Sequence, residues 1–339
     1  MKLLIDGRVL KHKYITGVER YTFNLVEEFK KMGLNYDIFI PQTSNRYLQH
    51  IWENVRLPIK AGAYDILFCP GNISPLWKSG RCRYVTTIHD ISFKFFKDSY
   101  SFPYRFYHDK TLNRVLKLSD AIVTISNYEK EMLSKYYPWA SDKIKVICNG
   151  ISDKLKDQKI NYEKQKYILY VGSLNKRKNL EGLIKAFVNI SDKVPHDLVI
   201  AGAKQGLYKG TGAINHSRIK YLGFVKDDEL IELYRNAALF VFPSFYEGFG
   251  LPVLEAMVLG CPVITSNTSS IPEVAGDAAI KVDPRNTEEI ASAMIRVLND
   301  QNLSWELIAK GLERVKLFSW KKSAEALVSV FRELTEKNR

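Results

Sequence analysis

The sequence lacks any uninterrupted run of about 20 apolar residues, the length that a helix needs to span a bilayer, although 46% of its 339 residues are hydrophobic. The first ten residues, MKLLIDGRVL, become charged too early for a signal peptide and predict a strand instead. We therefore expect a cytoplasmic protein, and a peripheral position at the inner face of the plasma membrane stays open.

Cysteine is scarce, and its spacing excludes common metal motifs. The chain has four cysteines, Cys69, Cys82, Cys148 and Cys261, and none of them forms a Cys-x-x-Cys pair. Each lies in or beside an apolar run, which argues against a zinc site or a disulfide framework. We expect buried thiols and no bound metal.

Signatures of nucleic-acid binding are also missing, although the formal net charge is +13. Such a surplus favours nucleic acid, an anionic membrane surface or anionic small molecules. The chain has no recognition-helix pattern, RRM aromatic box or basic arm, so nucleic acid ranks last and is not an expected partner. The basic residues are spread along the chain, and many of them are typical of solvated helix faces.

No repeat at a solenoid period is present; strand-like runs instead alternate with helical ones, which predicts parallel sheets covered on both faces. We expect two doubly wound, Rossmann-like α/β domains facing across a cleft, at residues 1–155 and 165–319, with a polar linker between them at 151–165. The helix predicted at 320–339 caps the second domain or crosses back to the first. The expected strands are Leu3–Asp6, Tyr36–Ile40, Ile66–Cys69, Tyr84–His89, Ala121–Ser126, Ile144–Cys148, Tyr167–Val171, Leu198–Ala201, Tyr221–Phe224, Ala238–Phe242, Val263–Thr265 and Ile280–Val282.

The stretch FPSFYEGFGLPVLEA at 242–256 carries the clearest chemical pattern. It reads as the end of a strand, a loop with Gly248 and Gly250, and a helix that begins at Leu251. Backbone N–H groups and a helix N-terminus favour a phosphate. Glu247 and Glu255, with seven residues between them, can accept hydrogen bonds from hydroxyls. The pattern therefore indicates a nucleotide sugar, although two spaced acids alone are equally typical of a loop charge and a helix surface.

The stretch at 242–284, FPSFYEGFGLPVLEAMVLGCPVITSNTSSIPEVAGDAAIKVDP, resembles the signature region of retaining glycosyltransferases of family 4, which have the two-domain GT-B fold. The resemblance continues through YVGSLNKRKNLEGLIKAF at 170–187 and LGFVKDDELIELYRNAALFVFPS at 222–244. The first half is similar more loosely, through IDGR, TGVERYTFNL, TTIHDIS and VTISNYEKE. The first domain is thereby expected to bind the acceptor and the second to bind the donor.

The resemblance implies roles for individual residues. Glu247 contacts the donor sugar's hydroxyls and Glu255 holds the ribose; we expect Glu247 at the surface of its loop. Arg177 and Lys178 neutralise the leaving diphosphate, whereas Ser173 stands where relatives carry an arginine. A solvated basic turn is the competing interpretation of Arg177 and Lys178. The remaining donor-binding positions that it implies are Gly248, Phe249, Gly250, Leu251, Phe224 and Gly17.

In the first half, His89 is at the end of the expected strand Tyr84–His89, at the carboxyl edge of the predicted sheet, and the resemblance implies a contact with the donor sugar. A single histidine is otherwise more often structural. Gly17, in TGVER, is similar to a glycine-rich loop that lets diphosphate and acceptor approach, with one glycine where many relatives have two. The sequence has no Asp-x-Asp motif, so the chemistry is expected to need no metal or other cofactor.

The implied reaction is transfer of a hexose, from GDP-mannose or a UDP-sugar, to a hydroxyl of a glycan or lipid-linked glycan with retention, in polysaccharide or lipopolysaccharide biosynthesis. A nucleotide-sugar 2-epimerase of similar fold and a non-catalytic nucleotide-sugar binder remain alternatives. The segment at 104–118, YRFYHDKTLNRVLKL, combines aromatic and basic residues. It fits a helix resting on an anionic membrane surface, and equally a core-packed helix with one wet face.

Overall fold

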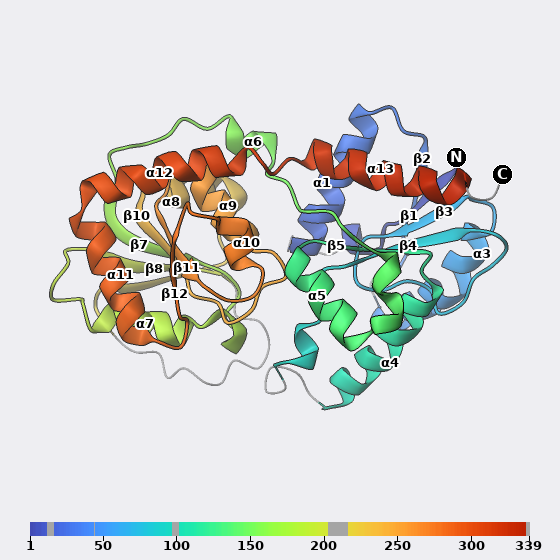
Figure 1. Ribbon diagram of the computed structural model, residues 1–339, viewed down its shortest axis with the longest axis horizontal. Coiled ribbons are helices and arrows are strands. Elements are labelled where there is room, and N and C mark those ends of the chain that lie inside the picture. Colours follow the sequence, from blue (N-terminus) through green and yellow to red (C-terminus); the bar gives the residue numbers. More distant parts are fainter. Residues whose placement is uncertain (12–16, 44, 97–101, 203–215, 337–339) are drawn as a thin grey trace. The chain divides into compact units, whose positions relative to one another are not determined.

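The computed structural model describes residues 1–11, 17–43, 45–96, 102–202 and 216–336. The chain divides into two compact units (Figure 1). Unit 1 comprises Met1–Gly150 and Ser319–Arg339, and unit 2 comprises Ile151–Phe318. Each unit has its own sheet, and the two are described separately below.

Within the described residues, unit 1 forms a six-stranded sheet in the order β2-β1-β3-β4-β5-β6, in which every paired strand is parallel. Because both faces of such a sheet are covered, the strands β1, β3 and β5 are buried at every residue. The strands are β1 Leu3–Asp6, β2 Tyr36–Phe39, β3 Ile66–Cys69, β4 Arg83–Ile88, β5 Ala121–Thr124 and β6 Ile144–Val146.

One face of this sheet is covered by α1 (Gly17–Lys31) and by α13 (Trp320–Glu336), which pack against each other. The rings of Phe29, Phe68 and Phe331 bring together α1, β3 and α13, with centroids 5.6 to 6.5 Å apart. The helix at the end of the chain therefore belongs to unit 1, where its apolar side fills the core of the first sheet.

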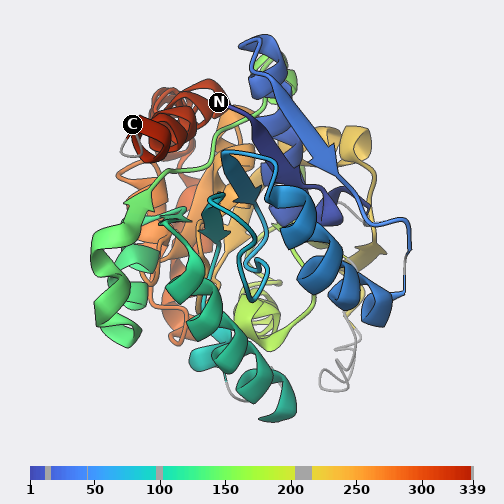
Figure 2. The same ribbon diagram turned by 90° about the vertical axis from the view of Figure 1, so that its right-hand side faces the viewer.

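The opposite face carries helices that the sequence analysis predicted only in part. A continuous helical segment at 46–61, absent from the sequence prediction, buries Trp52, Leu57 and Ala61 against Leu67 and Tyr84. Figure 2 shows this segment and α4 away from α13. The helices of this face are α2 Arg46–Ile51, the π-helical turn η2 Trp52–Arg56, α3 Leu57–Ala61, α4 Phe102–Leu118 and α5 Asn127–Tyr136; the 3-10 turns of unit 1 are η1 Arg8–Lys11, η3 Ser92–Lys94 and η5 Pro138–Lys143.

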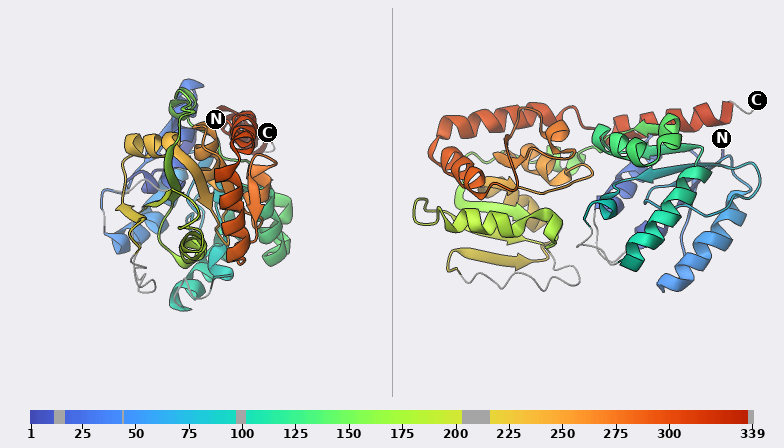
Figure 3. Two further views of the ribbon diagram at one scale, coloured as in Figure 1. Left: turned by 90° about the vertical axis from the view of Figure 1, so that its left-hand side faces the viewer. Right: turned by 60° about the horizontal axis from the view of Figure 1, so that its bottom comes forward.

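Unit 2, over the described residues, also forms a six-stranded parallel sheet, in the order β12-β11-β10-β7-β8-β9. The strands are β7 Gln165–Val171, β8 Asp197–Ala201, β9 Ile219–Gly223, β10 Ala237–Phe242, β11 Val263–Ser266 and β12 Ile280–Val282. The chain crosses in both directions from the central strands, which places helices on both faces (Figure 3). The expected doubly wound α/β fold is thus confirmed in both units.

The helices of unit 2 pack in two groups. One group joins α7 (Leu180–Val188) to α11 (Thr287–Asn299), and the other joins α9 (Leu251–Val258) to α8 (Asp227–Asn236), α10 (Ile271–Ala275) and α12 (Gln301–Val315). The segment 151–165, expected as a linker, belongs to unit 2. It carries α6 (Asp153–Lys156), and its polar side chains bind α8, as when Asn161 donates to Asn236.

In the part of the chain that the structure describes, no helix has the length and apolar character needed to cross a membrane. Cys69, Cys82 and Cys261 are buried, and Cys148 is partly exposed.

The packing of Gly150 against the start of the last helix of unit 1 can be tested by substitution. A Cβ atom at Gly150 would overlap the backbone nitrogen of Trp320 and the carbonyl carbon of Ser319. Backbone cannot rotate away as a side chain can, so Gly150→Ala should destabilise the protein by roughly 1–3 kcal/mol. We expect a lower Tm and urea midpoint. Gly17→Ala is the control, since a Cβ there meets nothing within 4 Å; equal Tm values for the two variants would contradict this packing.

Candidate active site

Two neighbouring loops at the carboxyl edge of the unit 2 sheet contain most of the predicted site residues. Strands β7 and β10 are paired in parallel, so the loop 172–179 after β7 lies beside the loop 243–250 after β10. The backbone N–H of Phe245 donates to the carbonyl of Arg177 at 2.9 Å, which joins the two loops directly. The switch from β7 to β10 is where a doubly wound sheet places its ligands.

Asn179, which the sequence analysis did not single out, holds these loops in place. Its backbone is left-handed (φ 53°), and its side-chain amide donates to the carbonyls of Pro243, at 3.0 Å, and Pro284, at 2.6 Å. Gly182 leaves room for this side chain, because a Cβ there would lie 2.5 Å from its Oδ1. The basic turn before Asn179 is therefore fixed relative to the end of β10.

Lys178 and Glu247 form a buried ion pair between the two loops. The Nζ of Lys178 lies 2.7 and 2.8 Å from the two carboxylate oxygens of Glu247 and 4.9 Å from the centroid of the Phe242 ring. Their side chains are only 12% and 7% exposed. The expectation that Glu247 lies at the surface of its loop is therefore wrong, because its charge is balanced by a lysine brought from another strand.

Arg177 and Ser173 lie on the same loop as Lys178. The Nη1 of Arg177 donates to the carbonyl of Tyr246 at 3.3 Å, which directs the guanidinium toward the loop of Glu247. The hydroxyl of Ser173 accepts from the amide of Asn175 at 2.9 Å, and Asn175 in turn caps the turn η6 (Lys176–Lys178). Ser173 thus shapes the basic turn through Asn175.

The loop of Glu247 leads into α9 through a conformation that needs glycine. Gly250 is the N-cap of α9 with φ 107°, and a Cβ there would lie 2.5 Å from Ile271 Cδ1. Gly248 and Phe249 are buried with it, and the Phe249 ring packs on Phe318 with centroids 5.7 Å apart. The N-terminal end of α9, from Leu251, therefore has its positive dipole end at this edge of the sheet.

Two serine hydroxyls hold the same loop from the side of β11. Ser269 accepts from the backbone N–H of Glu247 at 3.0 Å, and Ser270 donates to the carbonyls of Glu247 and Phe249. In the sequence, these contacts are signalled only by the string SNTSS between a strand and a proline-initiated helix. The hydrogen bonds of the two serines fix the backbone on both sides of Gly248.

Glu255 and Phe224 lie elsewhere on unit 2. Glu255 is half-buried on α9, and its Oε2 accepts from the Tyr234 hydroxyl of α8 at 3.3 Å. Phe224 follows β9 and its side chain is 60% exposed. Glu247 and Glu255 thus have different partners, Lys178 for the first and Tyr234 for the second.

His89 and Gly17 belong to unit 1, where His89 follows β4 and Gly17 is the first residue of α1; Thr16 of the TGVER motif lies outside the described residues. His89 is buried, its Nε2 lies 2.6 Å from the carbonyl of Pro70, and its ring meets Tyr21 edge-on. Burial lowers the pKa of His89, although the bond to Pro70 opposes the shift. Because a carbonyl only accepts, Nε2 carries the proton, and Nδ1 of the neutral ring can accept a hydrogen bond.

Over the described ranges, no three His, Cys, Asp or Glu side chains are grouped so that they could hold a metal ion. Positive groups at the edge of the unit 2 sheet include Arg177, Lys178 and the N-terminus of α9. Metal-independent chemistry stays a prediction.

Comparison with known proteins adds to this geometry. Residues 152–314 match the family model "Glycosyl transferases group 1", and residues 15–155 match "Glycosyltransferase Family 4". The chain is 34% identical to O-antigen chain mannosyltransferase B of Escherichia coli, over 98% of this chain and 100% of that protein. It is 31% identical to the serotype-specific mannosyltransferase WbdA of Escherichia coli over 64% of this chain, which spans 29% of WbdA.

The fold also matches solved structures. Sucrose-phosphate synthase from Thermosynechococcus elongatus superimposes with a TM-score of 0.79 over 99% of both chains, at 19% identity. At this identity the match concerns the fold, which is the two-domain GT-B arrangement that the sequence motifs predicted.

The Lys178–Glu247 pair makes a quantitative prediction for stability. Lys178→Met or Glu247→Gln alone leaves one buried charge without its partner, at a cost of about 3–5 kcal/mol. The two losses of stability should not add. We expect the double variant to unfold at a higher urea concentration than the sum of the two single losses predicts, with a coupling free energy of about 1–3 kcal/mol.

The matched control is the exposed pair Lys185–Glu181, whose side chains are 58% and 52% exposed. Lys185→Met should cost no more than about 1 kcal/mol. Strictly additive losses at Lys178 and Glu247 would mean that the two charges do not interact in solution.

Proposed function

Because the chain belongs to the family 4 glycosyltransferases, we propose that it transfers a mannosyl group from GDP-mannose to a hydroxyl of a glycan or lipid-linked glycan in surface-polysaccharide assembly. The similarity to an O-antigen chain mannosyltransferase, at 34% identity over 98% of the chain, carries this proposal. A UDP-sugar is the alternative donor. A cytoplasmic location, where nucleotide sugars are made, is part of the proposal.

Unit 2 supplies the groups that a nucleoside diphosphate sugar needs. The backbone N–H groups of Gly248, Phe249 and Gly250, together with the N-terminus of α9 at Leu251, are assigned to the diphosphate. Glu255 is assigned to the ribose hydroxyls, since its carboxylate already accepts from one hydroxyl, that of Tyr234. The exposed ring of Phe224 is assigned to the base, and Ser173 shapes the turn beside the phosphates.

Arg177 and Lys178 act on the leaving group. When the bond between C1 of the sugar and the phosphate oxygen breaks, the nucleoside diphosphate gains negative charge. Cations held in place before the reaction stabilise that charge without further reorganisation. Arg177 is anchored through Tyr246 and Lys178 through Glu247, so both cations are fixed by the loop that also carries the diphosphate-binding amides.

The environment of Glu247 supports retention without a covalent intermediate. Both of its carboxylate oxygens are bound by Lys178, which makes them weak nucleophiles. Glu247 therefore binds sugar hydroxyls, and the acceptor oxygen attacks C1 from the side of the leaving phosphate. The acceptor's proton passes to that phosphate oxygen as the new glycosidic bond forms.

His89 Nδ1 can accept a hydrogen bond from a hydroxyl of the donor sugar, and the approach of diphosphate and acceptor is assigned to the start of α1 at Gly17.

The test is turnover with a panel of nucleotide sugars and a mannose-terminated glycolipid acceptor. We expect release of GDP only when acceptor is present, and an α-linked product by its one-bond C1–H1 coupling. Arg177→Ala should lower kcat/KM by about a hundredfold, or about 3 kcal/mol, as loss of one preorganised donor does. Lys176→Ala, an exposed neighbour in the same turn, is the matched control and should retain full activity.

Three outcomes would contradict the proposal. Isomerised donor without transfer to an acceptor would favour a nucleotide-sugar 2-epimerase. Nucleotide binding without any turnover would favour a non-catalytic binder. A β-linked product would exclude retention from an α-linked donor, even if transfer occurs.

We also propose that unit 1 rests on an anionic membrane surface. On α4, Phe102, Phe106 and Tyr107 are 70%, 57% and 45% exposed, and Arg105 and Lys110 lie over two of these rings. The His50 ring, 6.0 Å from Tyr107, brings α2 beside α4. The helical segment 46–61 adds further exposed apolar residues, which are Tyr47, Leu48, Ile51, Val55 and Ile59. Apolar side chains mixed with Arg56, Lys60 and the basic residues of α4 are typical of a helix surface that binds lipid headgroups.

Sedimentation with vesicles tests this membrane surface. Binding to phosphatidylglycerol vesicles should weaken as salt rises, and each basic residue removed from α4 should weaken it about fivefold, since each contributes about 1 kcal/mol. Phe106→Ser should weaken binding further. Trp305→Ser, which removes a ring that is 51% exposed on unit 2, is the control and should bind as the wild type does. Equal binding to neutral phosphatidylcholine vesicles at every salt concentration would contradict the proposal.

A further inference from the structure

Asn72 of unit 1 has a backbone conformation that few residues with a side chain adopt. Over the part of the chain that the structure describes, three residues other than glycine are left-handed: Asn72 (φ 61°), Asn179 and Ser269. The last two hold the loops of the candidate donor site in unit 2. Such a conformation persists only where neighbouring groups hold it, and it collects at functional sites. The partners of Asn72 therefore indicate what its conformation serves.

Asn72 joins the loop after β3 to the end of β4. Its backbone N–H donates to the carbonyl of Thr87 at 2.9 Å, and its side-chain Oδ1 accepts from the backbone N–H of His89 at 2.6 Å. One residue thus binds the chain on both sides of Ile88, where β4 ends. A change in the backbone of Asn72 would break at least one of these bonds, so its left-handed conformation and the position of His89 depend on each other.

The ring of His89 is held by the same loop. Its Nε2 lies 2.6 Å from the carbonyl oxygen of Pro70, which can only accept, so Nε2 carries the proton and Nδ1 is the acceptor of the neutral ring. The ring also meets Tyr21 edge-on, with centroids 4.7 Å apart, and the Tyr21 hydroxyl lies 3.0 Å from that of Thr87. The backbone and the ring of His89 therefore have separate partners, and the loop 70–72 supplies one of each.

Arg8 secures the middle of this loop from the segment after β1. Its Nη2 donates to the carbonyl of Gly71 at 3.4 Å, and its Nε lies 3.9 Å from Oε1 of Glu53, whose side chain is 1% exposed. A Cβ at Gly71 would lie 2.8 Å from Cγ1 of Val9, so the loop lies directly against the segment that carries Arg8. The loop is consequently held at Gly71 by Arg8 and at Asn72 by β4.

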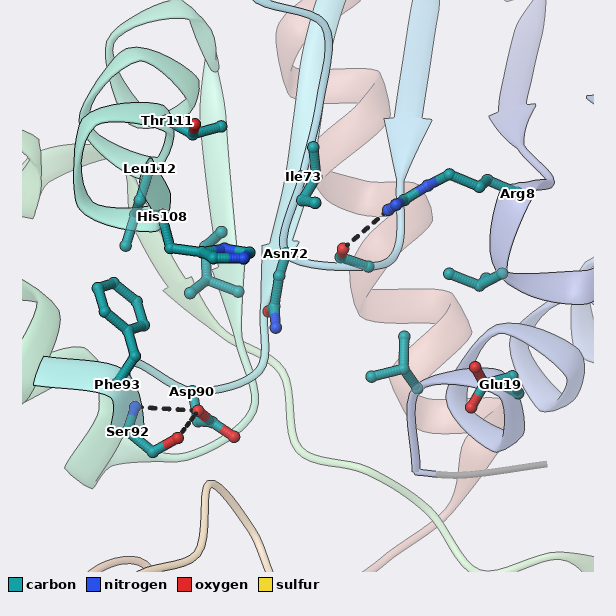
Figure 4. A pocket seen from close by; sticks show the side chains of 14 residues that line it. Arg8, Glu19, Asn72, Ile73, Asp90, Ser92, Phe93, His108, Thr111 and Leu112 are labelled. Carbon is teal, nitrogen blue, oxygen red and sulfur yellow. Dashed lines mark hydrogen bonds between the residues drawn. The ribbon is translucent and has the colours of Figure 1, made fainter. Parts of the chain in front are cut away.

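Packing alone does not fix the loop, because it borders a cavity of about 320 Å³ in unit 1 (Figure 4). Residues that line this cavity include Gly71, Asn72 and Ile73, together with Arg8, Glu19 and Asp90. A segment with open space on one side can shift unless directional bonds hold it. The hydrogen bonds of Asn72 and Arg8 supply that restraint.

We infer that Asn72 is a positioning residue for His89: it fixes the backbone of His89 so that Nε2 stays bound to Pro70 and Nδ1 remains the acceptor for a hydroxyl of the donor sugar. The inference rests on the proposed function, which assigns that hydroxyl to His89. A histidine that serves only packing can use either ring nitrogen, whereas an acceptor for a substrate needs one of them kept free of its proton. Asn72 acts through His89, and Arg8 supports it through Gly71.

The first experiment identifies the protonated nitrogen of His89 by NMR. The chain has six histidines, so labelling histidine with nitrogen-15 gives a simple spectrum, in which the signals of His89 are those lost in His89→Gln. At about pH 8 the ring is neutral, because the ordinary imidazole pKa is about 6.5 and burial lowers that of His89. We expect the proton on Nε2 in the wild type. A proton on Nδ1 would overturn the inference.

Two substitutions separate the side chain of Asn72 from its backbone. Asn72→Gly suits the left-handed conformation but removes Oδ1, so the signals of His89 should move toward a mixture of both tautomers. Asn72→Asp keeps an acceptor oxygen and tolerates the same conformation, so it should retain the wild-type tautomer. The matched control is Asn54→Ala, which also removes an Oδ1 that accepts a backbone N–H, that of Leu76 at 3.0 Å, and should leave His89 unchanged. The wild-type tautomer in folded Asn72→Gly would contradict the positioning role.

Turnover shows whether the position of His89 matters for transfer. Asn72→Gly should lower kcat by about tenfold to a hundredfold, because a misplacement of about 1 Å can cost about a hundredfold. The KM for GDP-mannose should change little, since the diphosphate and the base are assigned to unit 2. In a His89→Gln background, Asn72→Gly should have no further effect on kcat, because both substitutions act on one contact. Losses that multiply independently would show a merely structural role and overturn the inference.

The tautomer and the turnover together separate this inference from the proposed function. The tautomer of His89 is measured without donor, acceptor or reaction. If the wild type neither binds GDP-mannose nor transfers sugar, the proposed function fails, and the tautomer in Asn72→Gly still decides whether Asn72 positions His89. If the wild type transfers mannose but His89→Gln or folded Asn72→Gly keeps full kcat, the proposed transfer stands and the inference fails.

Discussion

The candidate donor site depends on the need to neutralise a lysine that the chain buries at the end of a strand. Lys178 is 12% exposed, and a cation in that position is tolerated only with a partner of opposite charge. Glu247 supplies the partner from a different loop, so the ion pair joins the basic turn after β7 to the glycine-bearing loop after β10. Asn179 and the serines at 269 and 270 then fix the backbones that carry the two charges. The ion pair that balances the buried charge of Lys178 therefore also sets the positions of the two loops.

Unit 1 uses the same physical solution with different residues. Arg8 follows β1 as Lys178 follows β7, and a buried carboxylate from a helical segment, Glu53, lies against it. In both units a cation at the carboxyl edge of a parallel sheet is oriented by an acid from a separate segment. The difference lies in the surroundings. The unit 2 cations lie beside the neighbouring loop, which leads into the N-terminus of α9 and favours phosphate, whereas Arg8 lines a cavity together with Glu19 and Asp90.

The sequence predicted the fold well because alternation of buried strands and amphipathic helices is a local property. Most strands, and the helix Trp320–Glu336, appear where the pattern placed them. The helical segment 46–61 was missed because a π-helical turn in its middle and Pro58 interrupt the helical period. The sequence predicted which residues form the candidate site, but it did not predict which of them contact each other. Three features depend on contacts between segments far apart in the sequence, and residue spacing cannot predict them. They are the burial of Glu247, the role of Asn179 and the pairing of Arg8 with Glu53.

The net charge of +13 illustrates why composition alone could not choose among partners. Much of the surplus lies on exposed side chains, such as Lys176 and the basic residues of α4, where water and salt screen it. Among its described lining residues, the cavity of unit 1 has Arg8 together with the carboxylates of Glu19 and Asp90. A ligand inside the cavity responds to groups a few ångströms away in a poorly screened environment, whereas an approaching membrane responds to the averaged surface. The partners of a basic chain therefore follow from the local arrangement of its charges and not from their sum.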